Sequence, residues 1–379
     1  MREYIEQVRN IFGRQCDFRL REEEPASPIA QAVAAKYSDL FRDNFIERLK
    51  RLNKVYSEAN HNRAVIITLL KKAALKRNWA GAFAELSAYD YLNLKVDDGR
   101  RPVSLNKIPT TMTLGRYWRN GRGTDLDCYF EDFDVYMDVK VLADNVKQLL
   151  ESIYGDLKQK LGRVDFYVTE DRPLDLDAEV VKAHRKELLN ELVNLFGRAE
   201  RPKAFRSQVI PQILFQVNWE SGWCGSNKFY DPYIHAQASH KLAFKHSKKY
   251  VERKPFLLLF VVFPWFNGVI SRFGGGNKIF YRSFSRRVFC EYIRRRTLFK
   301  TFEPDFNSNL TVRTVSKKLS GIIFLEDNSI TSRDEPDGNY SAYVYLNPNA
   351  DNSVVRSTFQ HYLLSLPRVE YDDFEFDNY

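Results

Sequence analysis

The chain has 379 residues, of which 44% are hydrophobic and 28% are charged, and this composition excludes an intrinsically disordered protein. Its longest apolar stretch, residues 256–263, is far shorter than the roughly 18–20 residues that span a bilayer, and the N-terminus MREYIEQVRN is charged where a secretory signal is apolar. We therefore expect no membrane segment and a cytoplasmic protein. The net charge of +9 favours a polyanionic partner, and nucleic acid is the commonest one.

Helical patterning marks residues 1–75. Apolar residues recur at three- and four-residue spacing over residues 44–56 and 63–75, with Lys and Arg between them. Pro25 and Pro28 lie in a polar stretch that predicts a loop. We expect an N-terminal helical region over residues 1–75, which is either a module facing a partner or DNA, or a packing extension of the core.

From residue 78 the pattern predicts helices alternating with strands. The predicted helices cover residues 78–94, 144–161, 178–196 and 232–250, and the predicted strands cover residues 126–130, 135–141, 164–169, 212–217, 256–263, 321–325 and 342–346. The strand at 256–263 is apolar on both faces, which is typical of a sheet covered by helices on both sides. We expect an α/β domain over residues 76–350 with a central sheet, followed by a C-terminal helix and acidic tail at 351–379.

Two adjacent predicted strands each have an apolar face and a charged face, within GTDLDCYFEDFDVYMDVKVL at 123–142. Because side chains alternate along a strand, Asp125 and Asp127 share a face of the first strand, and Asp138 and Lys140 share a face of the second. The short link around residues 131–133 suits a hairpin that brings these faces together. A solvent-exposed hairpin explains the apolar face but not the collected like charges, whose repulsion a divalent cation would remove. Lys140 could then orient water and stabilise charge on a phosphate.

Glu85 lies in the predicted helix that precedes these strands. It shares a helix face with Gly81, Ala88 and Leu92, a small apolar stripe that predicts burial. Because an unpaired buried carboxylate is costly, we expect Glu85 to pair with a metal ion or with Lys140. The alternative is that Glu85 lies at the edge of the stripe and reaches water.

The order of a helix with Glu85, a strand with Asp127, a strand with Asp138-x-Lys140 and a further helix resembles the PD-(D/E)xK nuclease superfamily. That superfamily includes many restriction enzymes and Holliday-junction resolvases, and the resemblance covers about residues 81–161. It implies a restriction-endonuclease-like mixed central sheet flanked by helices. It also implies that Asp127 binds metal, Asp138 is the acid of the (D/E)-x-K step, Lys140 is the catalytic lysine and Glu85 is the helix acid. The implied reaction is Mg²⁺- or Mn²⁺-dependent hydrolysis of phosphodiesters, with DNA favoured and a 5′-phosphate left on the product.

The metal-binding Asp has two candidates because the hairpin register is open. A two-residue turn at residues 131–132 places Asp125 opposite Asp138, whereas a four-residue turn over residues 131–134 places Asp127 there. The sequence T-D-L-D-C-Y resembles a family pattern with an acid two positions before the metal-binding Asp, which favours Asp127. No proline precedes either candidate, a departure that many members share.

Basic residues that we expect to contact phosphates form two clusters. They are Arg116, Arg119 and Arg122 in the first cluster, and Arg286 and Arg287 in the second, which Arg294, Arg295 and Arg296 extend. A solvated charged helix is the alternative for the second cluster. The acidic and aromatic end of the chain, VEYDDFEFDNY, is expected to be disordered, and the alternative is that it occupies a basic groove as a DNA mimic.

Histidine and cysteine spacing argues against a zinc site. His235, His240 and His246 on one predicted helix do not meet on one face within reach of a single metal. The widely spaced Cys16, Cys128, Cys224 and Cys290 are expected to be buried free thiols.

A role in restriction or phage defence rests on analogy with nucleases that carry long additions of this kind. Two alternatives are a nucleic-acid-binding protein that has lost cleavage and a subunit that is active only inside a complex. A homodimer and a partner protein of a defence complex both stay open as assemblies.

Overall fold

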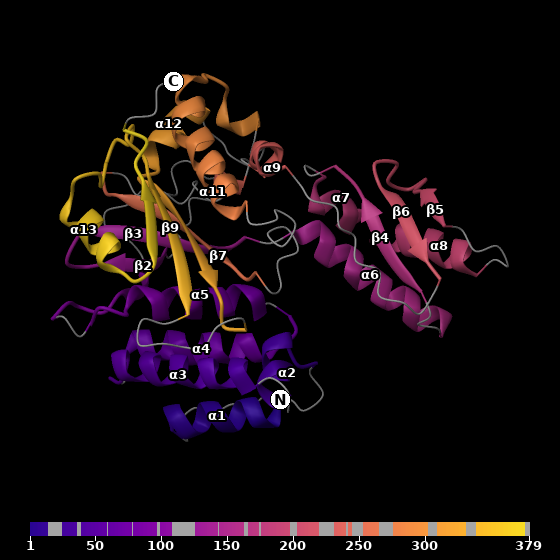
Figure 1. Ribbon diagram of the computed structural model, residues 1–379, viewed down its shortest axis with the longest axis horizontal. Helices are drawn as coiled ribbons and strands as arrows, with labels where there is room; N and C mark the ends of the chain where they lie inside the picture. Colours follow the sequence, from indigo (N-terminus) through magenta and orange to yellow (C-terminus); the bar gives the residue numbers. More distant parts are fainter. Residues whose placement is uncertain are drawn as a thin grey trace. The chain divides into compact units, whose positions relative to one another are not determined.

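The computed structural model describes residues 1–13, 25–35, 39–58, 60–77, 79–96, 99–107, 126–142, 144–162, 166–173, 176–197, 203–219, 231–239, 242–244, 253–264, 276–301, 309–330 and 339–375 (Figure 1). The chain divides into two compact units, and each is described by itself. The first comprises Met1–Leu142, His240–Phe266 and Lys278–Tyr379, and the second comprises Ala143–Ser239 and Asn267–Asn277. The N-terminal helices thus belong to the unit of the central sheet, whereas residues 143–239, expected within one domain over 76–350, form a unit of their own.

The described residues of the first unit form a seven-stranded sheet in the order β1-β2-β3-β7-β8-β9-β10. Its strands are β1 (Ser104–Lys107), β2 (Leu126–Phe130), β3 (Val135–Val141), β7 (Phe256–Val262), β8 (Gly321–Asp327), β9 (Tyr340–Leu346) and β10 (Val369–Asp372). The three central strands β3, β7 and β8 run parallel, and β10 runs parallel to β9. The pairs β1–β2, β2–β3 and β8–β9 are antiparallel, so the sheet is mixed. Every residue of β7 is buried, as its uninterrupted apolar sequence predicts.

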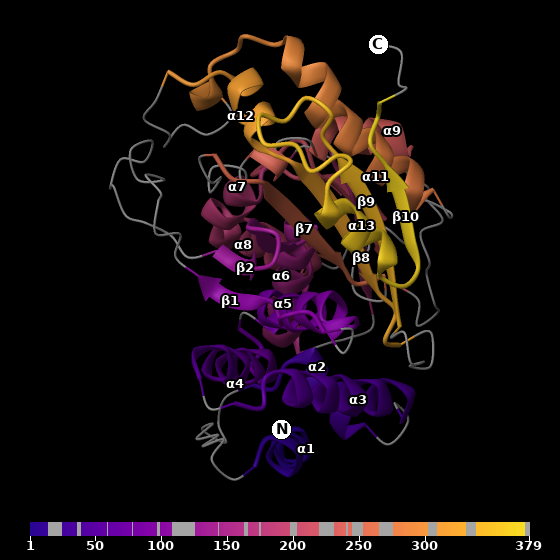
Figure 2. The same ribbon diagram turned by 90° about the vertical axis from the view of Figure 1, so that its left-hand side faces the viewer.

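Helices cover both faces of this sheet, which confirms the predicted α/β class (Figures 1 and 2). On one side lie α1 (Arg2–Phe12), α2 (Pro28–Ala34), α3 (Asp39–Val55), α4 (His61–Ala74), α5 (Trp79–Leu92) and α13 (Thr358–Ser365), which share one apolar core with that face. On the other side, α11 (Asn277–Arg286) packs Phe284 against Phe260 and Phe324. A π-helical turn (Arg287–Glu291), 3₁₀ turns (Tyr292–Arg294 and Phe299–Thr301) and α12 (Val312–Lys318) follow α11.

The second unit has a three-stranded antiparallel sheet among its described residues, in the order β4-β6-β5. Its elements are α6 (Asn145–Leu161), β4 (Tyr167–Asp171), α7 (Ala178–Ala183), α8 (Arg185–Phe196), β5 (Ala204–Arg206), β6 (Leu214–Asn218) and α9 (Pro232–Ser239). Leu150, Leu188 and Phe215 belong to an apolar core whose members all come from this unit. In the chain, residues 143–239 of this unit lie between the neighbouring strands β3 and β7.

Two local predictions are wrong. The stretch around Pro28 is not a loop, because Pro28 is the first residue of α2 and the Ser27 hydroxyl caps that helix by accepting a hydrogen bond from the Ala30 amide. The end of the chain is not disordered up to residue 375, since β10 pairs with β9 and Arg282 forms an ion pair with Asp372 at 2.7 Å. Residues 376–379 lie outside the described part.

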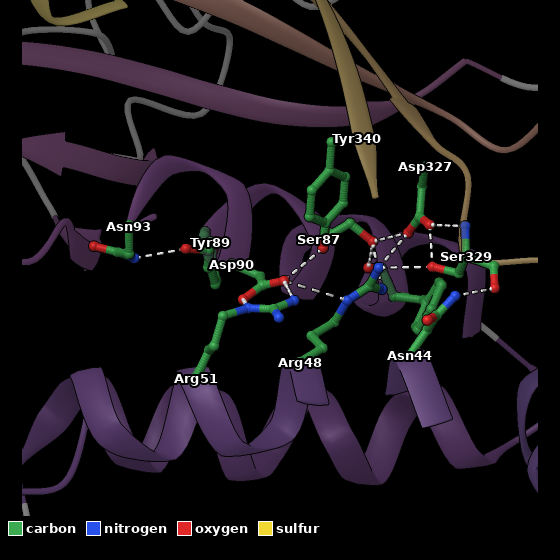
Figure 3. A network of polar contacts seen from close by, with 11 residues as sticks. Asn44, Arg48, Arg51, Ser87, Tyr89, Asp90, Asn93, Asp327, Ser329 and Tyr340 are labelled. Carbon is green, nitrogen blue, oxygen red and sulfur yellow. Dashed lines mark hydrogen bonds and ion pairs between the residues drawn. The ribbon is translucent and has the colours of Figure 1, made fainter. Parts of the chain in front are cut away.

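A buried polar network joins α3 to α5 and to the end of β8 (Figure 3). The Arg48 guanidinium lies 2.8 Å from Asp327 Oδ2, and it donates to the hydroxyls of Ser329 and Ser87 at 2.9 and 3.0 Å. Burial acts to lower the pKa of Arg48, but the nearby Asp327, Tyr340 and Asp90 reverse this and raise it, so the side chain stays charged. The network therefore places a buried cation between elements far apart in the sequence.

Asp90 of α5 extends the same network (Figure 3). Its two carboxylate oxygens accept hydrogen bonds from Arg51 at 2.8 and 2.7 Å, and Tyr340 of β9 donates to the second oxygen at 2.8 Å. Since Asp90 and Glu85 lie on one helix, these bonds fix the position of the helix that carries Glu85.

Other predictions can be compared directly with the described residues. None of their helices combines the length and the apolar character that crossing a bilayer requires. Cys128 and Cys290 are buried free thiols, as predicted, whereas Cys16 and Cys224 lie outside the described residues. His235 is buried in α9, and His240 and His246 lie outside the described residues.

Candidate active site

The pairing of β2 with β3 fixes the register that the sequence left open. Cys128 stands opposite Met137 and Phe130 opposite Val135, so Asp127 is the residue opposite Asp138. β2 and β3 are therefore connected by the four-residue turn over residues 131–134. Of the two turns considered, this is the one that places Asp127 opposite Asp138. Asp125 lies outside the described residues.

The edge strand β1 places a further polar residue beside Asp127. Leu105 pairs with Cys128 and Lys107 pairs with Leu126, which places Asn106 opposite Asp127. Asn106 has a φ of 47°, a left-handed conformation that asparagine adopts more readily than most residues. The sequence analysis missed Asn106 because it predicted no strand over residues 104–107.

Three oxygen atoms, two from β3 and one from β2, converge on the ammonium group of Lys140. Its Nζ lies 2.7 Å from Asp138 Oδ2, 2.7 Å from the Val139 carbonyl oxygen and 3.4 Å from Asp127 Oδ2. The Asp138 side chain is fully buried, whereas those of Asp127 and Lys140 are 15% and 21% exposed. Burial acts to lower the pKa of Lys140, but the carboxylates of Asp138 and Asp127 outweigh it and raise the pKa. Lys140 is therefore a fixed positive charge near neutral pH and not a base.

Glu85 reaches the same region from α5. Its carboxylate lies 3.3 Å from the hydroxyl of Tyr89, and that hydroxyl also lies 3.2 Å from the Asp127 carbonyl oxygen. Burial, reinforced by the charge of Asp127, raises the pKa of Glu85 to about 7, although Lys140, Tyr89 and Lys72 act in the opposite direction. Glu85 can thus exchange a proton near neutral pH. Tyr89 was not singled out from the sequence, although its position one helical turn after Glu85 is a signal that points to it.

The donor atoms around Lys140 are the kind that Mg²⁺ and Mn²⁺ prefer. Two carboxylates and a backbone carbonyl supply hard oxygen ligands, and they already surround a positive charge, the Lys140 ammonium. A divalent cation at these oxygens would have to displace the ammonium. Within the described ranges, no group of three or more His, Cys, Asp or Glu side chains is placed to hold one metal ion. The participation of Glu85, Asp127 and Asp138 as metal ligands thus stays a prediction, and the observation is that Asp127 and Asp138 lie opposite each other beside Lys140.

The expected phosphate-binding arginines lie partly outside the described residues. Arg116, Arg119 and Arg122 fall in residues 108–125, which the structure does not describe. Arg286 ends α11 and Arg287 follows it, and each lies 3.6 Å from a carboxylate oxygen of Glu291. Their contact with phosphate stays a prediction.

No protein-family model, no curated protein and no solved structure was found to match this chain. A function for this chain is therefore inferred from the positions and chemistry of its own residues.

Proposed function

We propose that this chain is a nuclease of the PD-(D/E)xK type with a restriction-endonuclease-like core, which hydrolyses phosphodiester bonds with Mg²⁺ or Mn²⁺. DNA is the favoured substrate. The observation that carries the proposal is the meeting of Asp127, Asp138 and Lys140 on two antiparallel strands, with Asp127 directly opposite Asp138. The mixed sheet with helices on both faces supports it.

The three residues divide two tasks between them in this proposal. Asp127 and Asp138 would hold the divalent cation, which supplies Lewis-acid activation of water and neutralises charge on the phosphate. Lys140, which lies next to both carboxylates, would supply a second positive charge beside the cation. A fixed charge of this kind stabilises the negative charge that develops on a phosphate during attack by water.

Glu85 and Tyr89 support the site from the helix. The Tyr89 hydroxyl reaches both the Glu85 carboxylate and the backbone of Asp127, so it holds α5 against the start of β2. With a pKa of about 7, Glu85 is suited to accept or release a proton beside the reacting groups. The N-terminal helices and the second unit would select a substrate or a partner, as in restriction or phage-defence nucleases.

The test is cleavage by the purified full-length chain of supercoiled plasmid, linear duplex, single-stranded DNA and RNA, with Mg²⁺, Mn²⁺ or EDTA. Asp138→Asn and Lys140→Met are compared with Glu131→Gln, which alters a carboxylate in the turn between the same strands. We expect metal-dependent cleavage by the wild type and by Glu131→Gln only. Cleavage that persists in EDTA or in both site variants would contradict the assignment. Binding without cleavage under every condition would favour a nucleic-acid-binding protein on this fold.

A further inference from the structure

A pocket opens beside Glu85 and Asp127 on the side of the N-terminal helices. His61, Thr68 and Lys72 of α4 line it together with Asn106 of β1, Glu85 of α5 and Asp127 of β2. Two of the residues assigned above to the site therefore form part of its wall. The remaining polar residues come from α4 and β1, which have had no functional role so far.

The three α4 residues form one exposed stripe. They are spaced by seven and by four positions, so they lie on the same helix face, and all three side chains are exposed. The stripe extends over about 16 Å at 1.5 Å per helical residue. Such a length is suited to an extended ligand rather than to a single small anion.

The wall is held in place by the packing of α4 on β1. Asn62 of α4 accepts a hydrogen bond of 3.0 Å from the amide of Leu105 in β1. Val65 and Leu69, which also line the pocket, and Leu70 on the opposite side of α4 all belong to the main apolar core. Lys72 and Asn106 are therefore presented by two elements that are fixed to one another.

The charges of the pocket complement a phosphodiester strand. Lys72 is a cation close enough to Glu85 to act against the rise of the Glu85 pKa, and the Asn106 amide and the His61 ring supply further hydrogen-bond donors. Phosphate oxygens take most protein contacts in nucleic-acid complexes, and Lys and Asn are among the usual donors. An anionic phosphate that enters the pocket has to approach carboxylates. The positive charge of Lys72 beside them reduces the repulsion between the phosphate and these carboxylates.

We propose that this pocket binds the backbone of the nucleic-acid strand next to the scissile phosphate, with Lys72 and Asn106 as its phosphate contacts. The proposal rests on the nuclease function proposed above and adds the path that the substrate takes over α4. The ligand is defined by its phosphodiester backbone, which DNA and RNA share. The N-terminal helical region is then part of the active-site cleft and not a separate module.

The test measures binding by the full-length chain in EDTA, where no cleavage occurs. Fluorescence anisotropy with labelled duplex DNA, single-stranded DNA and RNA gives the Kd over a series of salt concentrations. Lys72→Gln is compared with Lys71→Gln, which removes the same charge from the neighbouring position of α4 that does not line the pocket. Lys72→Arg tests whether the charge alone suffices.

We expect Lys72→Gln to weaken binding several-fold and to reduce the salt slope by about 0.9 for duplex DNA or about 0.7 for a single strand, the loss of one phosphate contact. Lys71→Gln should stay within twofold of the wild type, and Lys72→Arg should bind like the wild type. With Mg²⁺, Lys72→Gln should raise KM. The oligonucleotide with the largest loss identifies the strand that the pocket binds.

Equal Kd values and equal salt slopes for Lys72→Gln and Lys71→Gln would overturn the pocket proposal, as would a wild-type chain that binds none of the oligonucleotides. Cleavage of the same oligonucleotides by the wild type in Mg²⁺ would leave the nuclease assignment standing in that case. Conversely, a specific loss in Lys72→Gln without any metal-dependent cleavage by the wild type would retain the binding pocket and overturn the nuclease.

Discussion

Oδ2 of Asp127 accepts a hydrogen bond of 2.7 Å from the backbone amide of Val139. Val139 stands between Asp138 and Lys140, so this bond ties the start of β2 to the strand that carries the other two site residues. The same oxygen lies 3.4 Å from the Lys140 ammonium. Asp127 therefore has a structural contact with Val139 and an electrostatic contact with Lys140. Substitutions that keep the oxygen acceptor but remove the charge can distinguish the effects of these two contacts.

Asp127→Asn should lose activity but keep stability. The amide oxygen of asparagine still accepts from Val139, while the charge that would hold a cation is gone. We expect cleavage to fall by about 10²–10³-fold, the usual effect of removing one electrostatic group from an active site. Asp127→Ala should show the same loss and be less stable by about 1–3 kcal/mol, because a part-buried amide loses its acceptor. Cleavage rates and urea unfolding distinguish the two, and wild-type turnover in Asp127→Asn would remove this residue from the site.

Lys140→Met should make the stability of the chain more dependent on Mg²⁺. The substitution removes the ion pair with the fully buried Asp138, which costs about 3–5 kcal/mol when one partner of a buried pair is lost. Mg²⁺ should then raise Tm more than it does in the wild type, since no ammonium competes for the same oxygens. Thermal unfolding in EDTA and in Mg²⁺ measures this. Lys50→Met on the exposed side of α3 is the control, and equal Mg²⁺ effects in all three proteins would contradict the shared site.

The raised pKa of Glu85 predicts a pH dependence of stability. In the folded chain its pKa is about 7, above the ordinary value of 4.5, so between these values the folded state binds the proton more tightly than the unfolded state. The resulting stability is fully present below about pH 4.5 and is lost as the pH rises through about 7. The groups that face the carboxyl are Asp127 of β2, Lys140 of β3, and Tyr89 and Lys72 of the helices.

Glu85→Gln removes this ionisation and should flatten the pH profile. Relative to the wild type, the variant should gain on the order of 2–3 kcal/mol in free energy of unfolding between pH 5 and pH 8, measured without metal. Asp127→Asn should have a smaller effect in the same direction, because Asp127 contributes to the raised pKa less than burial does. A difference between wild type and Glu85→Gln that does not change with pH would contradict the assignment.

The buried network around Arg48 predicts a large loss of stability in Arg48→Ala. Without the guanidinium, Asp327 loses an ion pair at 2.8 Å in a fully buried environment, and the expected cost is about 3–5 kcal/mol. Lys50→Ala on the same helix changes an exposed pair with Glu47 and should cost less than about 1 kcal/mol. Urea unfolding compares the two. A loss in Arg48→Ala no larger than that in Lys50→Ala would show that the network contributes little.

The sequence predicted the relative positions of site residues best where these residues lie on one strand, because the alternation of side chains along that strand determines them. The alternation along residues 135–141 places Asp138 and Lys140 on one face, and the structure confirms that they meet. The choice between Asp125 and Asp127 depended on the length of the turn, which local alternation does not determine. The observed pairing of β2 with β3 decides it, because each strand position then has a single opposite residue.

The features that the sequence did not predict depend on contacts between segments that lie far apart in the chain. Asn106 and Lys72 border the site only because β1 pairs with β2 and α4 packs beside it. Arg48 appears in the sequence as one basic residue of an amphipathic helix, yet it is buried against Asp327, which lies 279 positions further along the chain. The end of the chain is rich in acids, which predicts disorder, but pairing with β9 and the ion pair with Arg282 stabilise it as a strand.

The placement of the second unit between β3 and β7 affects when the site can be completed during synthesis. The β2–β3 hairpin can form as soon as it is made, but the other edge of β3 has no partner until residues 256–262 have emerged. An unpaired apolar strand edge invites association with other chains. If residues 143–239 fold first on the core of the second unit, they shorten the unfolded connection between β3 and β7 and so lower the entropy cost of pairing these strands. The inserted unit would then act on the yield of active protein through the timing of assembly, even without touching a substrate.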